Sequence, residues 1–239
     1  MKPLVVITGA SSGIGRQAAI DFSKAGYPLL LLARRIDLLK ELKLPNSICA
    51  KVDVTDVQKF KTAVEKAEGM FGPVDLLINN AGVMPLESID VQPLSDQHLM
   101  VDINIKGVLN GMHAVIPSMK KNKHGTIINV SSCAGRYTYS DHAVYCGTKY
   151  AVHAISEQSR KELADFNIRV SIMAPAIVDT NLLVSVKDAN ILDSYNNIKK
   201  SINKGLKSSD ISNLMLYTYE LPQEVSLKEI LVSATKQKI

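Results

Sequence analysis

Three side chains that could exchange a proton with a substrate lie in the segment SSCAGRYTYSDHAVYCGTKYAV, Ser131 to Val152. Tyr145 and Lys149 occupy positions i and i+4, so on a helix they share one face. Ser132 comes just after an apolar run that is typical of a strand. A serine hydroxyl can hold a substrate oxygen, and a tyrosine hydroxyl can exchange a proton with it. The spacing predicts acid–base chemistry on a substrate oxygen.

The lysine is expected to make the tyrosine reactive. A tyrosine has an ordinary pKa of about 10, which is a poor match for proton transfer near neutral pH. An ammonium group about 4 Å away contributes about 4 kcal/mol at an effective dielectric constant of about 20. About 1.4 kcal/mol corresponds to a change of one pH unit in a pKa. Desolvation of the phenolate acts in the opposite direction. We therefore predict that Lys149 lowers the pKa of Tyr145 by about two pH units.

A glycine-rich turn follows the first apolar run. The sequence TGASSGIG, Thr8 to Gly15, lies between a predicted strand and a predicted helix. Glycines allow a tight turn and let backbone N–H groups approach a pyrophosphate at a helix N-terminus. The spacing differs from G-x-G-x-x-G, and a βα turn that binds nothing is the alternative. The position of the turn after the first strand favours a dinucleotide.

Two arginines indicate which dinucleotide is bound. Arg34 and Arg35 follow the second predicted strand, where an NAD site normally has a carboxylate for the ribose 2′-hydroxyl. Guanidinium groups match the oxygens of a 2′-phosphate, and that phosphate would offset the unfavourable placement of cations at a helix start. We therefore predict NADP(H) over NAD(H), with a pair of ordinary surface arginines as the alternative.

Short apolar runs rich in Val, Ile and Leu alternate with amphipathic segments along the chain. The predicted strands are Leu4–Ile7, Leu29–Ala33, Ile48–Val52, Val74–Ile78, Thr126–Val130, Arg169–Met173 and Glu229–Ser233. The predicted helices are Gly13–Ala25, Asp56–Glu68, Asp96–Met119, Ala143–Asp165 and Asp210–Glu220. Asp56 and Asp210 are expected as N-caps and Gly26 as a C-cap. This alternation predicts a doubly wound α/β sheet with helices on both faces, which binds ligands beyond the carboxyl ends of its strands.

Further motifs follow in a fixed order: Asp53-Val54, NNAG at Asn79–Gly82, and Asn104 in VDINIKG. With TGASSGIG, Ser132 and the Y-x-x-x-K of Tyr145, they resemble the short-chain dehydrogenase/reductase family over essentially the whole chain. The resemblance implies one Rossmann-fold domain over residues 1–239, with a seven-stranded, mainly parallel sheet.

The resemblance also implies hydride transfer between the nicotinamide C4 of NADP(H) and a carbonyl or carbinol carbon. In that mechanism Tyr145 exchanges a proton with the substrate oxygen, and Lys149 binds the nicotinamide ribose and lowers the pKa of the tyrosine. Ser132 orients the carbonyl, and Asn104 sustains a water relay to the lysine. The residues expected to bind the cofactor are Gly9, Ser11, Ser12, Gly13, Ile14, Gly15, Arg34, Arg35, Asp53, Val54, Asn80, Ala81, Gly82, Tyr145, Lys149, Pro175, Val178 and Thr180.

One position departs from the family pattern. Ala176 follows Pro175, where the family commonly has glycine. Its methyl group could narrow the pocket, or alter the backbone if a positive φ is required there.

The residues after Thr180, about 181–209, are where this family builds its substrate lid. Four lysines in it, Lys187, Lys199, Lys200 and Lys204, could steer an anionic substrate, or could simply keep a helix soluble. The C-terminal VSLKEILVSATKQ resembles members that reduce short 3-oxo acids, so a short 3-hydroxy acid or a small ketone is the expected substrate. The alternatives are a 3-oxoacyl-[acyl-carrier-protein] reductase, a non-catalytic protein that senses NADP, and a structural protein with an enzyme-like fold.

Composition excludes several other classes. The net charge is +5 with a pI near 9.0, but the basic residues are dispersed, so no nucleic-acid partner is predicted. The longest apolar run, Pro28–Ala33, is far shorter than the roughly 18 residues that cross a bilayer. Together with the lack of a signal-peptide core, this predicts a cytoplasmic protein without a membrane partner. The 3 cysteines lack metal-ligand spacing, so we expect reduced thiols and no metal.

Two predicted helices, Asp96–Met119 and Ala143–Asp165, carry apolar residues beyond one face, among them Val115, Ile116, Ala151, Val152 and Ile155. In this family the equivalent helices pair across subunits, so the resemblance implies a homodimer or homotetramer. The alternative is that both stripes pack on the sheet.

Overall fold

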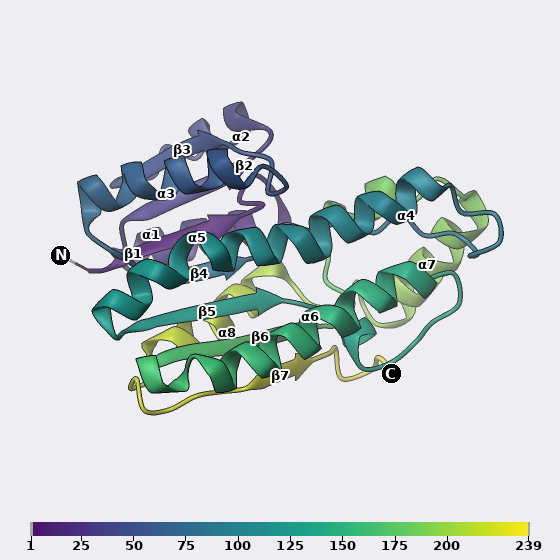
Figure 1. The fold of residues 1–239 in the computed structure, drawn as a ribbon. Coiled ribbons are helices and arrows are strands. Elements are labelled where there is room, and N and C mark those ends of the chain that lie inside the picture. The colour runs from purple at the N-terminus through teal and green to yellow at the C-terminus, as the bar shows by residue number, and fades with distance from the viewer. Residues whose placement is uncertain (1, 239) are drawn as a thin grey trace.

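The computed structural model describes residues 2–238 and contains a 7-stranded sheet with the strand order β3-β2-β1-β4-β5-β6-β7 (Figure 1). The strands are β1 (Leu4–Thr8), β2 (Leu29–Ala33), β3 (Ser47–Lys51), β4 (Val74–Asn79), β5 (Gly125–Val130), β6 (Ile168–Pro175) and β7 (Glu229–Val232). Every neighbouring pair is parallel. The order reverses at β1, which pairs with both β2 and β4. The predicted doubly wound α/β fold is confirmed.

Successive strand residues enter two separate apolar cores. Leu4 and Val6 of β1 belong to the core beneath α3, α5 and α6, whereas Val5 and Ile7 belong to the core beneath α1 and α8. The bounds of these helices are α1 (Gly13–Lys24), α3 (Val57–Phe71), α5 (Gly107–Asn122), α6 (Ala143–Glu162) and α8 (Ser208–Glu220). A short helix, α2 (Ile36–Lys40), joins β2 to β3. Because both faces of the sheet are covered, its strands are continuous apolar runs.

One of the three predicted helix caps is confirmed. The Asp56 carboxylate caps α3 by accepting the Lys59 N–H at 3.0 Å. The C-cap of α1 is Ala25, and Gly26, with a φ of +85°, comes one residue later than predicted. The prediction for Asp210 is wrong, because the N-cap of α8 is Lys207. Asp210 lies in the first turn and accepts the Lys207 N–H at 2.7 Å.

The predicted helix Asp96–Met119 is divided in three. It begins as α4 (Leu94–Val101), widens into a π-helical turn at Asp102–Lys106, and continues as α5. Such turns interrupt the regular hydrogen bonds of a helix and often occur at functional sites. Asn104, the candidate water-relay residue, lies within this turn.

The expected lid region contains a 3₁₀ turn, Asn181–Ser185, and a helix, α7 (Ala189–Ser201). With α4, it lies beyond the carboxyl edge of the sheet (Figure 1). The tail after β7 returns to this edge, where the Gln237 Oε1 accepts the Ile177 N–H at 3.2 Å. Two further 3₁₀ turns are Cys133–Gly135 and Ala164–Phe166.

The apolar residues expected at a subunit interface instead pack mainly inward. Val115 and Val152 are fully buried in the core of α3, α5 and α6, and Ile116 and Ile155 pack partly against it. These residues favour the alternative of packing on the sheet, and a homo-oligomer stays a prediction that light scattering can measure. Among residues 2–238, no helix combines the length and apolar character of a membrane span.

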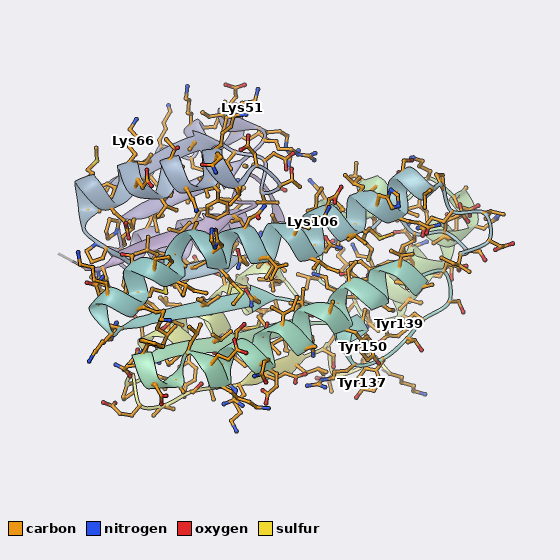
Figure 2. All side chains as sticks on the ribbon, viewed as in Figure 1. Lys51, Lys66, Lys106, Tyr137, Tyr139 and Tyr150 are labelled. Atoms are coloured by element: carbon orange, nitrogen blue, oxygen red, sulfur yellow. The ribbon has the colours of Figure 1, made fainter. Side chains whose placement is uncertain are left out.

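Basic side chains are spread over the surface. In Figure 2, Lys51 and Lys66 lie near the β2–β3 end of the molecule, whereas Lys106 lies close to the start of α5. This distribution agrees with the dispersed basic residues of the sequence.

Candidate active site

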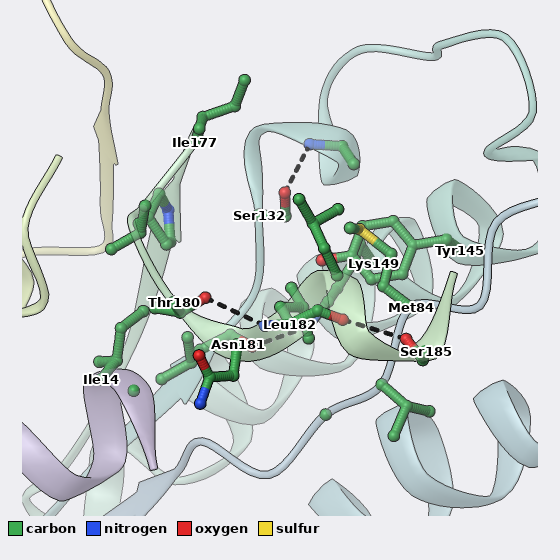
Figure 3. A pocket seen from close by; sticks show the side chains of 18 of the residues that line it. Ile14, Met84, Ser132, Tyr145, Lys149, Ile177, Thr180, Asn181, Leu182 and Ser185 are labelled. Atoms are coloured by element: carbon green, nitrogen blue, oxygen red, sulfur yellow. Dashed lines mark hydrogen bonds between the residues drawn. The ribbon is translucent and has the colours of Figure 1, made fainter. Parts of the chain in front are cut away.

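A cavity of about 1130 Å³ opens at the carboxyl edge of the sheet (Figure 3). Among the predicted cofactor-binding residues, all except Gly15 line it. Ser132, Tyr145 and Lys149 line the same cavity, whereas Asn104 lies behind its wall. The chain brings these residues together because the carboxyl ends of parallel strands share one edge.

The glycine turn is shaped by backbone packing. Gly9 and Gly13 have φ values of +65° and +53°, a region that glycine enters without strain. Gly15 lies beneath the turn, where a Cβ would be 2.4 Å from the Asn80 Nδ2 and 2.6 Å from the Gly9 carbonyl oxygen. Gly15 therefore permits close packing behind the cavity wall, rather than lining the cavity as predicted.

Thr8 joins the first turn to the NNAG segment. Its Oγ1 accepts the N–H groups of Asn80 at 2.9 Å and Ala81 at 3.0 Å. In return, the Asn80 Nδ2 donates to the Thr8 carbonyl at 3.0 Å. These bonds fix two walls of the cavity relative to each other.

The first turn of α1 fits a phosphorylated ligand. Its N-cap, Ser12, makes no side-chain capping bond, and no acidic residue lies in the first turn. The Arg35 guanidinium donates to Ser11 Oγ at 3.3 Å and Ser12 Oγ at 3.1 Å, and the exposed Arg34 lines the same wall. The helix dipole and both guanidinium groups therefore favour anionic oxygens here.

The three candidate catalytic side chains converge in the cavity (Figure 3). Ser132 Oγ accepts the Ala134 N–H at 3.1 Å. The Ser132 hydroxyl is also close enough to Tyr145 to lower the pKa of that phenol. Lys149 Nζ donates to the Val130 carbonyl at 3.0 Å and lies 5.6 Å from the centre of the Tyr145 ring. Both Tyr145 and Lys149 are 6% exposed.

Burial controls the titration of this pair. Burial raises the pKa of Tyr145 above its ordinary value, and contact with the Ser132 hydroxyl acts in the opposite direction. Burial also lowers the pKa of Lys149 to about 8. The prediction that Lys149 lowers the pKa of Tyr145 is therefore wrong for the chain alone. The burial of Tyr145 has a larger effect on its pKa than any neighbouring charge. The Lys149 ammonium group donates to the Val130 carbonyl instead of to the phenol.

Asn104 connects three segments behind the cavity. Its Oδ1 accepts the Val83 N–H at 2.9 Å, and its Nδ2 donates to the Val83 carbonyl at 3.0 Å and to Thr148 Oγ1 at 3.2 Å. The side chain thus ties the π-helical turn to the loop after β4 and to α6. The water relay stays a prediction.

Ala176 fits the backbone that it occupies. Its φ lies outside the left-handed region, and its N–H donates to the Val232 carbonyl at 2.8 Å. A glycine is therefore not required at this position for backbone reasons, and the Ala176 methyl group lies at the cavity wall.

Sequence reasoning missed several residues on the lid side of the cavity. Tyr139 and His142 lie in the segment that held the catalytic motif, and Met84 follows NNAG closely, so their positions gave a weak signal. Tyr195 gave none, because it reaches the cavity from α7. The Tyr139 hydroxyl donates to Cys133 Sγ at 3.4 Å.

Residues 2–238 contain no group of three or more His, Cys, Asp or Glu side chains arranged to hold a metal ion. Cys49, Cys133 and Cys146 are free thiols.

A family model described as short chain dehydrogenase matches residues 3–190. The chain belongs to the short-chain dehydrogenase/reductase family. The predicted family and its Rossmann-type fold are thereby confirmed.

Two relatives of this short-chain dehydrogenase/reductase extend over nearly its full length. An uncharacterised oxidoreductase of Staphylococcus saprophyticus is 38% identical, covering 99% of this chain and 97% of that protein. Sulfoacetaldehyde reductase 2 of Chromohalobacter salexigens is 32% identical, covering 99% and 96% respectively. The closed form of serine dehydrogenase complexed with NADP⁺ superposes with a TM-score of 0.90 at 27% identity, covering 99% of this chain and 96% of that one. The NADP⁺ in that structure agrees with the predicted cofactor.

Proposed function

We propose that this short-chain dehydrogenase/reductase transfers a hydride between NADP(H) and the carbonyl or carbinol carbon of a small molecule. The observation that carries the proposal is the meeting of Ser132, Tyr145 and Lys149 in the cavity that also contains the glycine turn and both arginines. NADP(H), when bound, supplies the hydride chemistry. The protein supplies the placement and the proton.

The cofactor half of the cavity offers a partner for each anionic part of NADP(H). The backbone of residues 9–13 at the start of α1 would hold the pyrophosphate, and Arg34 and Arg35 would hold the 2′-phosphate. Asp53 and Val54 line the cavity beyond these arginines and would border the adenine. These roles are supported by the lining of the cavity and by the bonds of Arg35 to the serine hydroxyls.

The catalytic side chains divide the work on the substrate oxygen. The Ser132 hydroxyl would hold the carbonyl oxygen, and the Tyr145 hydroxyl would donate its proton to that oxygen as negative charge develops. Because burial raises the pKa of Tyr145, the phenol carries its proton at neutral pH in the chain alone. That state is the one required for reduction of a carbonyl. The Lys149 ammonium would stabilise the phenolate that remains.

The other candidate functions have less support. A reductase acting on an acyl carrier protein needs a basic patch beside the cleft for its acidic partner. Two of the lid lysines are already paired, Lys187 with Asp96 at 3.0 Å and Lys199 with Asp179 at 2.7 Å. A non-catalytic sensor of NADP, or a structural protein, has no need for the converging serine, tyrosine and lysine.

The proposal is tested by turnover with both cofactors. The purified chain is mixed with NADPH or NADH and a panel of aldehydes, ketones and 3-oxo acids, and with NADP⁺ and secondary alcohols in the reverse direction. We expect reduction of at least one carbonyl class, with kcat/KM higher for NADPH than for NADH. A clear preference for NADH, or no turnover with any compound, would contradict the proposal.

A further inference from the structure

The cavity wall around Tyr145 is apolar and aromatic. The side chains that both line the cavity and belong to one apolar cluster are Val83, Met84, Ala134, Tyr139, Tyr145, Leu183, Ile191 and Tyr195. They come from the loop after β4, the segment after β5, α6 and the lid. A substrate whose carbonyl meets Tyr145 therefore has its body against this cluster.

Formal charge is nearly absent from this wall. Among the lining residues in 83–149 and 181–202, only Asp141 and Lys149 carry a formal charge. The Lys149 ammonium is 3.0 Å from the Val130 carbonyl, to which it donates. Burial lowers the pKa of the nearby His142 and so keeps its ring neutral at pH 7, although the Ser140 carbonyl beside its Nδ1 acts in the opposite direction. An anionic group on the body of the substrate would meet no counter-charge on this wall apart from Lys149, which lies at the catalytic end. Burying an unpaired carboxylate is strongly unfavourable.

The lid lysines do not change this picture. None of Lys187, Lys199, Lys200 and Lys204 lines the main cavity. Lys199, Lys200 and Lys204 instead border a separate shallow pocket of about 360 Å³, together with Asp179 and Asp193. These four cations therefore lie outside the lining of the cavity.

Two other lysines reach the cavity from its opposite side. Lys236 and Lys238 line it on the tail that Gln237 anchors to Ile177. In Figure 3, Ile177 lies on the far side of Ser132 from Tyr145. These lysines therefore border the region next to the end of β6, rather than the apolar wall.

We propose that the physiological substrate is an uncharged carbonyl compound with an apolar body, best matched by aromatic aldehydes and ketones. This inference rests on the proposed function and names its substrate class. An aromatic ring packs well against tyrosine rings and methionine sulfur, both of which the wall supplies. The carbonyl oxygen would meet Ser132 and Tyr145, while the ring fills the space below the lid.

Matched probes that differ in one carboxylate test the inference. The whole chain with saturating NADPH is assayed with benzaldehyde against 4-carboxybenzaldehyde, and with hexanal against 6-oxohexanoate. We expect kcat/KM to be about 100-fold higher for the uncharged member of each pair, because the charged member leaves a carboxylate unpaired. Equal values, or a preference for the acids, would overturn the inference while leaving the proposed function standing.

A double variant, Lys236→Gln with Lys238→Gln, separates the two sides of the cavity. We expect kcat/KM for benzaldehyde to stay within about twofold of the wild-type value, with the preference for the uncharged probe unchanged. The matched control is Lys187→Gln, outside the cavity. If the wild-type chain prefers the acids and the double variant loses that preference, the tail recognises an anion and the inference is wrong. If the wild-type chain binds NADPH, as measured by fluorescence, but reduces none of the probes, the proposed function is contradicted as well.

Discussion

The cofactor half and the substrate half of the cavity are built differently. In the cofactor half, backbone segments pack so closely that a Cβ on Gly9 would lie 2.9 Å from the Ala81 Cα. In the substrate half, side chains far apart in sequence, such as Met84, Tyr139 and Tyr195, share one apolar cluster. Backbone packing restricts the sequence tightly, whereas a wall of side chains tolerates exchange. The cofactor half therefore shows a recognisable glycine motif in the sequence, and we expect the side chains of the substrate half to determine which carbonyl is bound.

The largest effect is expected where the backbone is most crowded. In a Gly15→Ala variant, the new Cβ would lie 2.4 Å from the Asn80 Nδ2 and 2.6 Å from the Gly9 carbonyl, so the turn must move. The added methyl group would separate the glycine turn from the NNAG segment, which are hydrogen-bonded to each other. We therefore expect either that NADPH affinity falls by at least about 100-fold or that the variant does not fold. Fluorescence titration and thermal unfolding measure the two outcomes.

The matched control is Gly69→Ala in α3, where a Cβ would meet nothing within 4 Å. It should leave NADPH binding unchanged and stabilise the helix slightly. Wild-type NADPH affinity in Gly15→Ala would show that the cofactor half is not restricted by backbone packing.

This contrast also explains what the sequence could predict. The alternating apolar runs of β1 to β7, Thr8–Gly15 and the Y-x-x-x-K are local patterns, so the fold and the cofactor half follow from short-range spacing. Tyr195 could not be found in this way, because its place in the wall depends on how α7 folds over the cavity. The pKa of Tyr145 was missed for a related reason, since its burial arises from tertiary packing that no spacing encodes.

A smaller effect is expected at the cofactor phosphate. Arg34→Asp replaces an exposed cation on the cavity wall with an anion that would repel a 2′-phosphate. We expect kcat/KM for NADPH to fall by about 10- to 100-fold, with little change for NADH. The control is Arg16→Asp, one turn into α1 and outside the cavity lining. Equal losses with both cofactors would show that Arg34 does not recognise the 2′-phosphate.

The smallest effect concerns stability at His153 in α6, a residue outside both halves of the cavity. His153 is 5% exposed, and both of its ring nitrogens are buried without a hydrogen-bond partner among the described residues. Burial lowers its pKa more than Glu229, whose Oε1 lies 3.8 Å from the ring Nδ1, raises it. The unfolded chain therefore takes up the proton first as the pH falls. The contribution of neutral His153 to stability is therefore complete above about pH 6.5 and declines below it.

A His153→Leu variant should lose part of this dependence on pH. When the pH is lowered from 7 to 5.5, the unfolding temperature of both proteins should decrease. We expect the decrease to be roughly 2–4 °C smaller for the variant than for the wild type. Calorimetry at both pH values measures the difference. Parallel curves for the two proteins would show that His153 does not titrate within this range.

Tyr145→Phe tests the central claim most directly, because it removes one oxygen from the substrate half and nothing from the cofactor half. The control is Tyr150→Phe on the same helix, whose hydroxyl is bonded to the Arg136 carbonyl outside the cavity. Single-turnover oxidation of NADPH with a carbonyl should slow by about 1000-fold in Tyr145→Phe, with the Kd for NADPH within about twofold of wild type. Tyr150→Phe should react at the wild-type rate. Turnover in Tyr145→Phe within tenfold of wild type would contradict the assignment of Tyr145 as the proton donor.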